Sequence, residues 1–175
     1  PFGVINEESL DRLPADAQAL VWPLAVCPGD AAFERVASFV ARGGRLLLTA
    51  SPNHPRIHLT NEPAENPAQP PMFCMLLRKH LTGGRLVSMQ QPEMERLLDL
   101  TFDCTDEMGS PTRKHLILEI MGRNSNLILT GEDGRIVDCL RRVDFEMSEK
   151  RQVLPGLYYH LPPTQGKRDP FAVTG

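Results

Sequence analysis

The chain has 175 residues, of which 41% are hydrophobic and 23% are charged, and its formal net charge is −3. This composition is typical of one soluble globular domain with a hydrophobic core, and the slight negative charge argues against a protein that coats nucleic acid. No apolar run approaches the roughly 20 residues of a membrane-spanning helix, and the four cysteines form no CxxC pair. We therefore expect a cytoplasmic protein with reduced thiols and no membrane contact.

The positive charges gather in short clusters in the second part of the chain. Residues 1–70 contain five Lys and Arg against eight Asp and Glu, whereas residues 71–175 contain fourteen of each. A fold that brings the clusters together would present a basic face, although a solvated surface pair is the commoner explanation of any one cluster. The candidate phosphate contacts are Arg78, Lys79, Arg141 and Arg142.

The first fifty residues read as strand, helix and strand. The apolar run 19–26 predicts a buried strand, Asp30 can cap a helix with apolar residues at i, i+3, i+4 and i+7, and Gly43-Gly44 should end that helix. Residues 45–49 predict a second buried strand. Two strands joined by a helix of about a dozen residues are typical of a βαβ unit, so we expect them to pair in parallel.

The rest of the chain predicts a helix followed by an antiparallel meander. A long connection with one short strand at 56–60 leads to Pro70-Pro71, which can open a helix that Gly83-Gly84 ends. Five strands should follow, at 85–91, 95–103, 115–121, 126–130 and 135–141. The predicted fold is α+β, an antiparallel β meander or sandwich with two main helices, preceded by the βαβ-like unit.

A polar link between two apolar strands is the first candidate binding site. Gly122-Arg123-Asn124-Ser125-Asn126 contains the Gly and Asn that a hairpin needs, because these residues tolerate positive φ. The planar guanidinium of Arg123 among short amide and hydroxyl side chains would make a donor-rich tip suited to phosphate or carboxylate. A solvated hairpin end is the alternative interpretation.

The second candidate is the dipeptide Glu95-Arg96, where a turn becomes a strand. In a regular strand the two side chains would point to opposite faces, so they can serve one site only at the strand's end or in a bulge. An ordinary surface ion pair is the alternative here.

Several enzyme classes leave no signature in the sequence. There is no Gly-x-Ser-x-Gly nucleophile elbow and no Gly-rich phosphate-binding loop. His54 and His58 have the spacing of two metal ligands on a helix, but Pro52 and Pro55 deny them that helix. We expect a protein that is not an enzyme and has no cofactor, metal site or small-molecule substrate.

Motifs between residues 46 and 170 resemble the NFACT-N domain of ribosome-associated quality-control proteins, also known as fibronectin-binding-like proteins. The motifs are NHPRIHLT (53–60), NP (66–67), PPMFCMLLRKHL (70–81), EIMGRNSN (119–126) and LPG (154–156). The resemblance implies an RNA-binding module that binds tRNA and the large ribosomal subunit obstructed by a peptidyl-tRNA, and supports C-terminal tailing of stalled chains. The family's acidic-Arg dipeptide falls on Glu95-Arg96. The candidate tRNA-binding residues are Glu95, Arg96, Arg123, Asn124 and Asn126.

Residues 1–45 do not resemble that family. VINEESLDRLP (4–14) and AAFERV (31–36) look instead like a piece of the middle domain of family 42 β-galactosidases. We therefore expect an α/β segment over 1–45 and an NFACT-N-like domain over 46–175, packed as one unit. The alternatives to an RNA-binding function are a designed or spliced chimera, or a β-galactosidase-derived scaffold fragment, without activity of its own.

Overall fold

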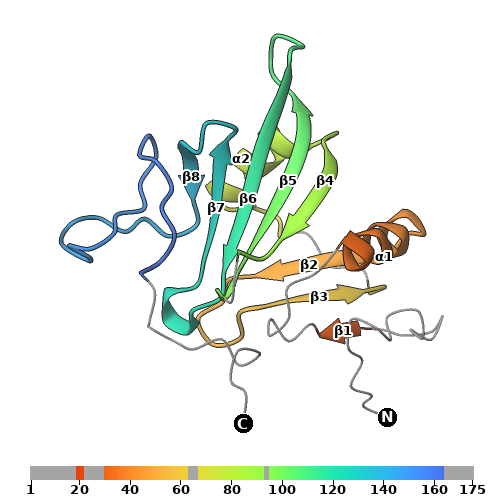
Figure 1. Cartoon of the computed structure of the whole chain (residues 1–175), viewed down its shortest axis with the longest axis horizontal. Helices are drawn as coiled ribbons and strands as arrows, with labels where there is room; N and C mark the ends of the chain where they lie inside the picture. Colours follow the sequence, from red (N-terminus) through yellow and green to blue (C-terminus); the bar gives the residue numbers. More distant parts are fainter. Residues whose placement is uncertain (1–18, 22–29, 63–66, 93–94, 164–175) are drawn as a thin grey trace, which may run out of the picture.

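The computed structural model describes residues 19–21, 30–62, 67–92 and 95–163. These residues form helices α1 (Asp30–Ala41) and α2 (Met72–Leu81) and a short 3-10 helix, η2 (Gly122–Asn124). One sheet contains, in spatial order, β1 (Ala19–Val21), β3 (Arg56–Thr60) and β2 (Arg45–Thr49). The other contains β4 (Arg85–Gln90), β5 (Leu97–Thr105), β6 (Pro111–Glu119), β7 (Asn126–Gly131) and β8 (Ile136–Cys139) (Figure 1). The predicted α+β class, with an antiparallel meander and two main helices, is confirmed.

The predicted parallel pairing of the first two strands is wrong. The order strand, helix, strand is present, but β3 lies between β1 and β2 and is antiparallel to both. Leu59 of β3 is opposite Leu20 on one side and Leu46 on the other. The link between β2 and β3 is short, so β3 folds back and pairs with β2 as an antiparallel neighbour. β3 therefore occupies the position beside β2 in which a parallel β1 would have paired. Residues 22–29, part of the predicted strand 19–26, lie outside the described residues.

The meander of five strands is present, and its longest pair extends beyond the prediction. β5 and β6 pair from Leu97 opposite Glu119 to Thr105 opposite Pro111. The apolar residues from which the strands were predicted cover only part of this pairing, because polar residues extend both strands toward the turn. One such polar pair is Arg113 and Asp103, in which the guanidinium donates to the carboxylate across the strands at 3.0 Å. β5 and β6 are therefore joined by a short turn, residues 106–110, at the end of the sheet opposite η2 (Figure 1).

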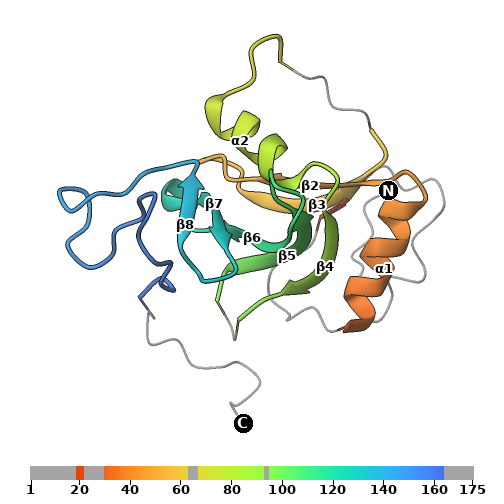
Figure 2. The ribbon, with the colours of Figure 1, turned by 90° about the horizontal axis from the view of Figure 1, so that it is seen from above.

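Hydrophobic residues pack on both faces of the five-stranded sheet. On one face a cluster joins α1, β3, β5 and β6, with Val36, Leu59 and Leu118 among its buried members. α2 covers this face, and its Leu77 and Leu81 pack against the cluster (Figure 2). The C-terminal segment contributes Val153 to a second cluster on the other face. The division at residue 45 and the packing of the two parts as one unit both stay predictions.

Both predicted helices end at their glycine pairs. Gly43 has a φ of 94°, and a Cβ on Gly44 would come within 2.1 Å of the Phe39 ring. Only glycine fits this approach, which explains the first pair. None of the helices in the described part of the chain is long and apolar enough to cross a lipid bilayer.

Candidate nucleic-acid interface

The link between β6 and β7 forms a short, ordered tip. Gly122 has a φ of 57° and begins η2, and Ser125 at the end of η2 is fully buried. The hydroxyl of Ser125 accepts a hydrogen bond from the backbone N–H of Met121 at 2.9 Å, which closes the turn on itself. Arg123 and Asn124 are exposed at its apex.

The side chain of Asn126 is buried and holds the tip by hydrogen bonds, so it adds no donor to the surface. Its side chain is 2% exposed, its Nδ2 donates to the carbonyl of Arg141 at 2.8 Å, and its Oδ1 accepts from the Arg141 backbone N–H at 2.9 Å. The Arg141 guanidinium in turn donates to the carbonyl of Arg123. The donor-rich tip expected from the sequence is therefore smaller than predicted, since Ser125 and Asn126 are committed to the protein's own backbone.

Glu95 and Arg96 lie at the same end of the sheet as this tip. The carbonyl of Arg96 accepts a hydrogen bond from the backbone N–H of Ile120 at 2.8 Å, two residues before η2 begins. β5 starts at Leu97, so the dipeptide sits at the strand's end, which is one of the two placements that let its side chains share a site. The Gln91 side chain holds the preceding turn by donating to the Glu95 carbonyl at 2.7 Å.

The charged groups at this end are available to a ligand. Arg96 and Arg123 are exposed and Glu95 is half-buried. Within the described residues, none of these three side chains makes an ion pair or a hydrogen bond. Two guanidinium groups without partners, fixed to adjacent backbone segments, present ten N–H donors in planar arrays that match phosphate or carboxylate geometry.

A buried charge network beneath the tip was missed by sequence reasoning. Glu119 is 1% exposed and receives two hydrogen bonds from the Arg151 guanidinium, one of them Nη1 to Oε2 at 3.2 Å. The Tyr159 hydroxyl donates to the same carboxylate at 2.8 Å, and Arg151 also lies over the Tyr159 ring. Burial, with a further contribution from Glu119, holds the pKa of Tyr159 well above its usual range.

This network ties the C-terminal segment to the end of the sheet. Arg151 completes its contacts by donating from Nε to the carbonyl of His160 at 2.7 Å. Glu119 is opposite Leu97, which follows Arg96. The sequence offered two signals: an acidic residue at the end of an apolar strand, and a basic pair at 150–151.

The four candidate phosphate contacts lie in two separate places. Arg141 and Arg142 follow β8 at the tip end, where the exposed Arg142 pairs with Asp138 at 3.4 Å. Arg78 and Lys79 are exposed on the last turn of α2, and the Lys79 ammonium is 2.7 Å from the carboxylate of Glu107 in the β5–β6 hairpin turn. The described residues hold no group of three side chains that could bind a metal ion.

Three comparisons identify relatives of this chain. The family model for NFACT N-terminal and middle domains matches residues 38–175. The protein named Rqc2 homolog RqcH of Bacillus subtilis is 44% identical over 128 residues, which are 73% of this chain and 22% of that protein. The mouse protein named ribosome quality control complex subunit NEMF is 37% identical over 86 residues, 49% of this chain and 8% of that protein.

A solved structure has the same fold. The N-terminal domain of fibronectin-binding protein PavA from Streptococcus pneumoniae superposes with a TM-score of 0.68 at 39% identity, over 75% of this chain and 49% of that chain. This chain thus spans about a quarter of the curated bacterial relatives and half of the solved one. The family match begins at residue 38, before the expected boundary, and the resemblance of 1–45 to a β-galactosidase finds no support in these comparisons.

Proposed function

The chain belongs to the family of NFACT N-terminal and middle domains, and from this membership we propose that it is the RNA-binding module of a cytosolic ribosome quality control factor. The module binds tRNA and the large ribosomal subunit obstructed by a peptidyl-tRNA, and so supports C-terminal tailing of stalled chains. Its contribution is binding and placement, without catalysis or a cofactor. The relatives named RqcH and NEMF support the quality-control role.

The observation that carries the proposal is the meeting of Arg96 and Arg123 at one end of the sheet. The two lie far apart in sequence, yet the backbone of Arg96 is bonded to Ile120 on the approach to η2. Both guanidinium groups are exposed and have no partner among the described residues, which is the state that a phosphate chain requires of its cationic contacts. Such contacts position a nucleic acid without reading its sequence.

The remaining residues of the interface take different roles in this proposal. Glu95 and Asn124 offer a carboxylate and an amide that can hydrogen-bond to ribose hydroxyls or to exposed base edges of single-stranded loops. Asn126 and Arg141 are positioning residues, because their mutual hydrogen bonds hold the turn that presents Arg123.

Filter binding of bulk tRNA to the intact chain at low salt tests the proposal. The double variant Arg96→Ala with Arg123→Ala should weaken binding by tenfold or more, because two phosphate contacts are lost. Arg85→Ala is the matched control, since this exposed arginine lies on β4 and should change binding little. Equal binding by the parent, the double variant and the control would remove this end of the sheet from the interface.

A further inference from the structure

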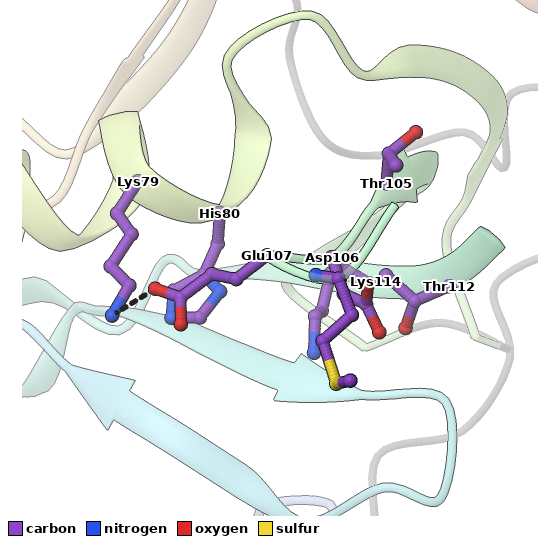
Figure 3. A pocket seen from close by; sticks show the side chains of 8 residues that line it. Lys79, His80, Thr105, Asp106, Glu107, Thr112 and Lys114 are labelled. Carbon is purple, nitrogen blue, oxygen red and sulfur yellow. Dashed lines mark hydrogen bonds and ion pairs between the residues drawn. The ribbon is translucent and has the colours of Figure 1, made fainter. Parts of the chain in front are cut away.

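A second candidate contact site lies at the opposite end of the β5–β6 pair. There the last turn of α2 faces the hairpin turn of residues 106–110, and a cavity of about 270 Å³ opens between them. In Figure 3, Lys79 and His80 reach from α2 on one side of Glu107, and Thr112 and Lys114 of β6 lie on the other.

The hairpin turn that forms one wall of this cavity is rigidly built. Asp106 accepts hydrogen bonds from the backbone N–H groups of Met108 and Ser110 at 2.9 and 2.8 Å. The backbone N–H of Asp106 donates back to the Ser110 carbonyl at 2.9 Å. One Asp106 oxygen is therefore already engaged by two donors, which reduces the repulsion that this carboxylate would exert on an anion in the cavity.

With His80 neutral, Lys79 and Lys114 balance the charges of Asp106 and Glu107, and Lys114 is the cation of the cavity that is not ion-paired within the described residues. Lys79 is paired with Glu107 at 2.7 Å, whereas Lys114 is half-buried and makes no ion pair or hydrogen bond within the described residues. Burial, and then the charges of Lys114 and Lys79, lower the pKa of His80, so the ring is neutral at pH 7 and can donate one N–H. The hydroxyl of Thr112 on the cavity wall also has no partner in the part of the chain that the structure describes.

We propose that this cavity takes a phosphate group of the bound RNA, held by Lys114 with Thr112 and His80, and that Glu107 opposes the binding by neutralising Lys79. The inference rests on the proposed function and deepens it by adding a second point of contact. An ammonium, a hydroxyl and a neutral imidazole N–H are together the donors that a phosphate oxygen accepts.

The position of the cavity determines how long a stretch of RNA would contact the protein under this proposal. Lys114 is five residues from Glu119 along β6, about 17 Å at roughly 3.4 Å per residue. α2 packs against β8, the strand that leads into Arg141 and Arg142. The helix that carries the exposed Arg78 therefore lies beside the strand that ends at the tip, and a phosphate chain can follow cations from one end to the other.

The two charge variants should act in opposite directions. Lys114→Gln removes the unpaired ammonium, so tRNA binding should weaken about fivefold and the slope of log K against log salt should become shallower by about one. Glu107→Gln releases Lys79 from its ion pair, so binding should tighten about threefold and the slope should steepen. A cavity that only supports the fold would give a loss or no change with both variants.

Arg113→Gln is the matched control for Lys114→Gln. It removes the same charge from the neighbouring residue of the same strand, whose side chain points to the opposite face and is paired with Asp103. Its binding should stay within twofold of the parent chain. Thermal unfolding of each variant confirms that the fold persists.

The outcomes separate this inference from the proposed function. If the tip variants at Arg96 and Arg123 abolish tRNA binding while Lys114→Gln and Glu107→Gln match the Arg113→Gln control, the second site is refuted and the proposed function stands. If the intact chain binds no tRNA, the proposed function fails and this inference fails with it. Competition by inorganic phosphate that is equal in the parent and in Lys114→Gln would also overturn the assignment, because Lys114 would then hold no phosphate.

Discussion

The two ends of the β5–β6 pair use charge differently. At the tip end one ion pair, between Glu119 and Arg151, is buried, and the surface arginines Arg96 and Arg123 have no partner among the described residues. At the hairpin end the ion pairs are exposed, among them the one between Lys79 and Glu107. The difference shows that available positive charge is decided by pairing and not by the number of lysines and arginines in a cluster.

The largest expected effect follows from breaking the buried pair. Glu119→Gln leaves the Arg151 guanidinium buried without its counter-charge, so the free energy of unfolding should fall by about 3 kcal/mol. Urea denaturation of the variant measures it. Glu107→Gln, which alters an exposed pair, should leave the urea midpoint unchanged. Equal midpoints for both variants would show that burial makes no difference between the two ends.

A smaller loss of stability should follow from removing the hydrogen bonds that hold the tip against Arg141. Asn126→Ala deletes the side-chain hydrogen bonds to both backbone groups of Arg141, at a cost of about 2 kcal/mol in unfolding free energy. Asn124→Ala changes the same residue type at an exposed position and should stay within about 0.5 kcal/mol of the parent. If Asn124→Ala proves the more damaging of the two, the tip is not held in the way described.

A modest pH effect should come from the core beneath the tip end. Burial, and then Asp138, raise the pKa of the Cys139 thiol to about 11 from an ordinary value of 9.0. The neutral thiol is therefore favoured in the folded state, and its contribution to stability is present below pH 9 and is lost as the pH rises toward 11. Chemical denaturation at pH 8 and pH 11 should show a decrease that is about 2 kcal/mol smaller in Cys139→Val, since one pKa unit corresponds to about 1.4 kcal/mol. An identical decrease in both chains would contradict the assignment.

Local sequence patterns predicted the helices and strands well, but they did not predict contacts between residues that are distant in sequence. The helix after Pro71 and the strand at 56–60 followed from local apolar spacing and breakers. The parallel pairing failed because a third strand inserts between the two, which the spacing within 19–49 cannot reveal.

The site was predicted in the same uneven way. Asn124 and Asn126 are two residues apart and chemically identical, yet one is exposed and the other is buried by a partner fifteen residues away. The pairing of Glu119 with Arg151 spans 32 residues, and no local signal connects them. Sequence reasoning could therefore name the tip and the Glu95-Arg96 dipeptide, but not the buried groups that hold them.

The salt dependence of tRNA binding tests the central claim most directly. The parent chain and the double variant Arg96→Ala with Arg123→Ala are compared from low to physiological salt. The account predicts that the slope of log K against log salt becomes shallower by about 0.7 to 0.9 for each arginine removed. An unchanged slope, with binding retained, would show that the two arginines meet at this end of the sheet without touching the phosphate chain.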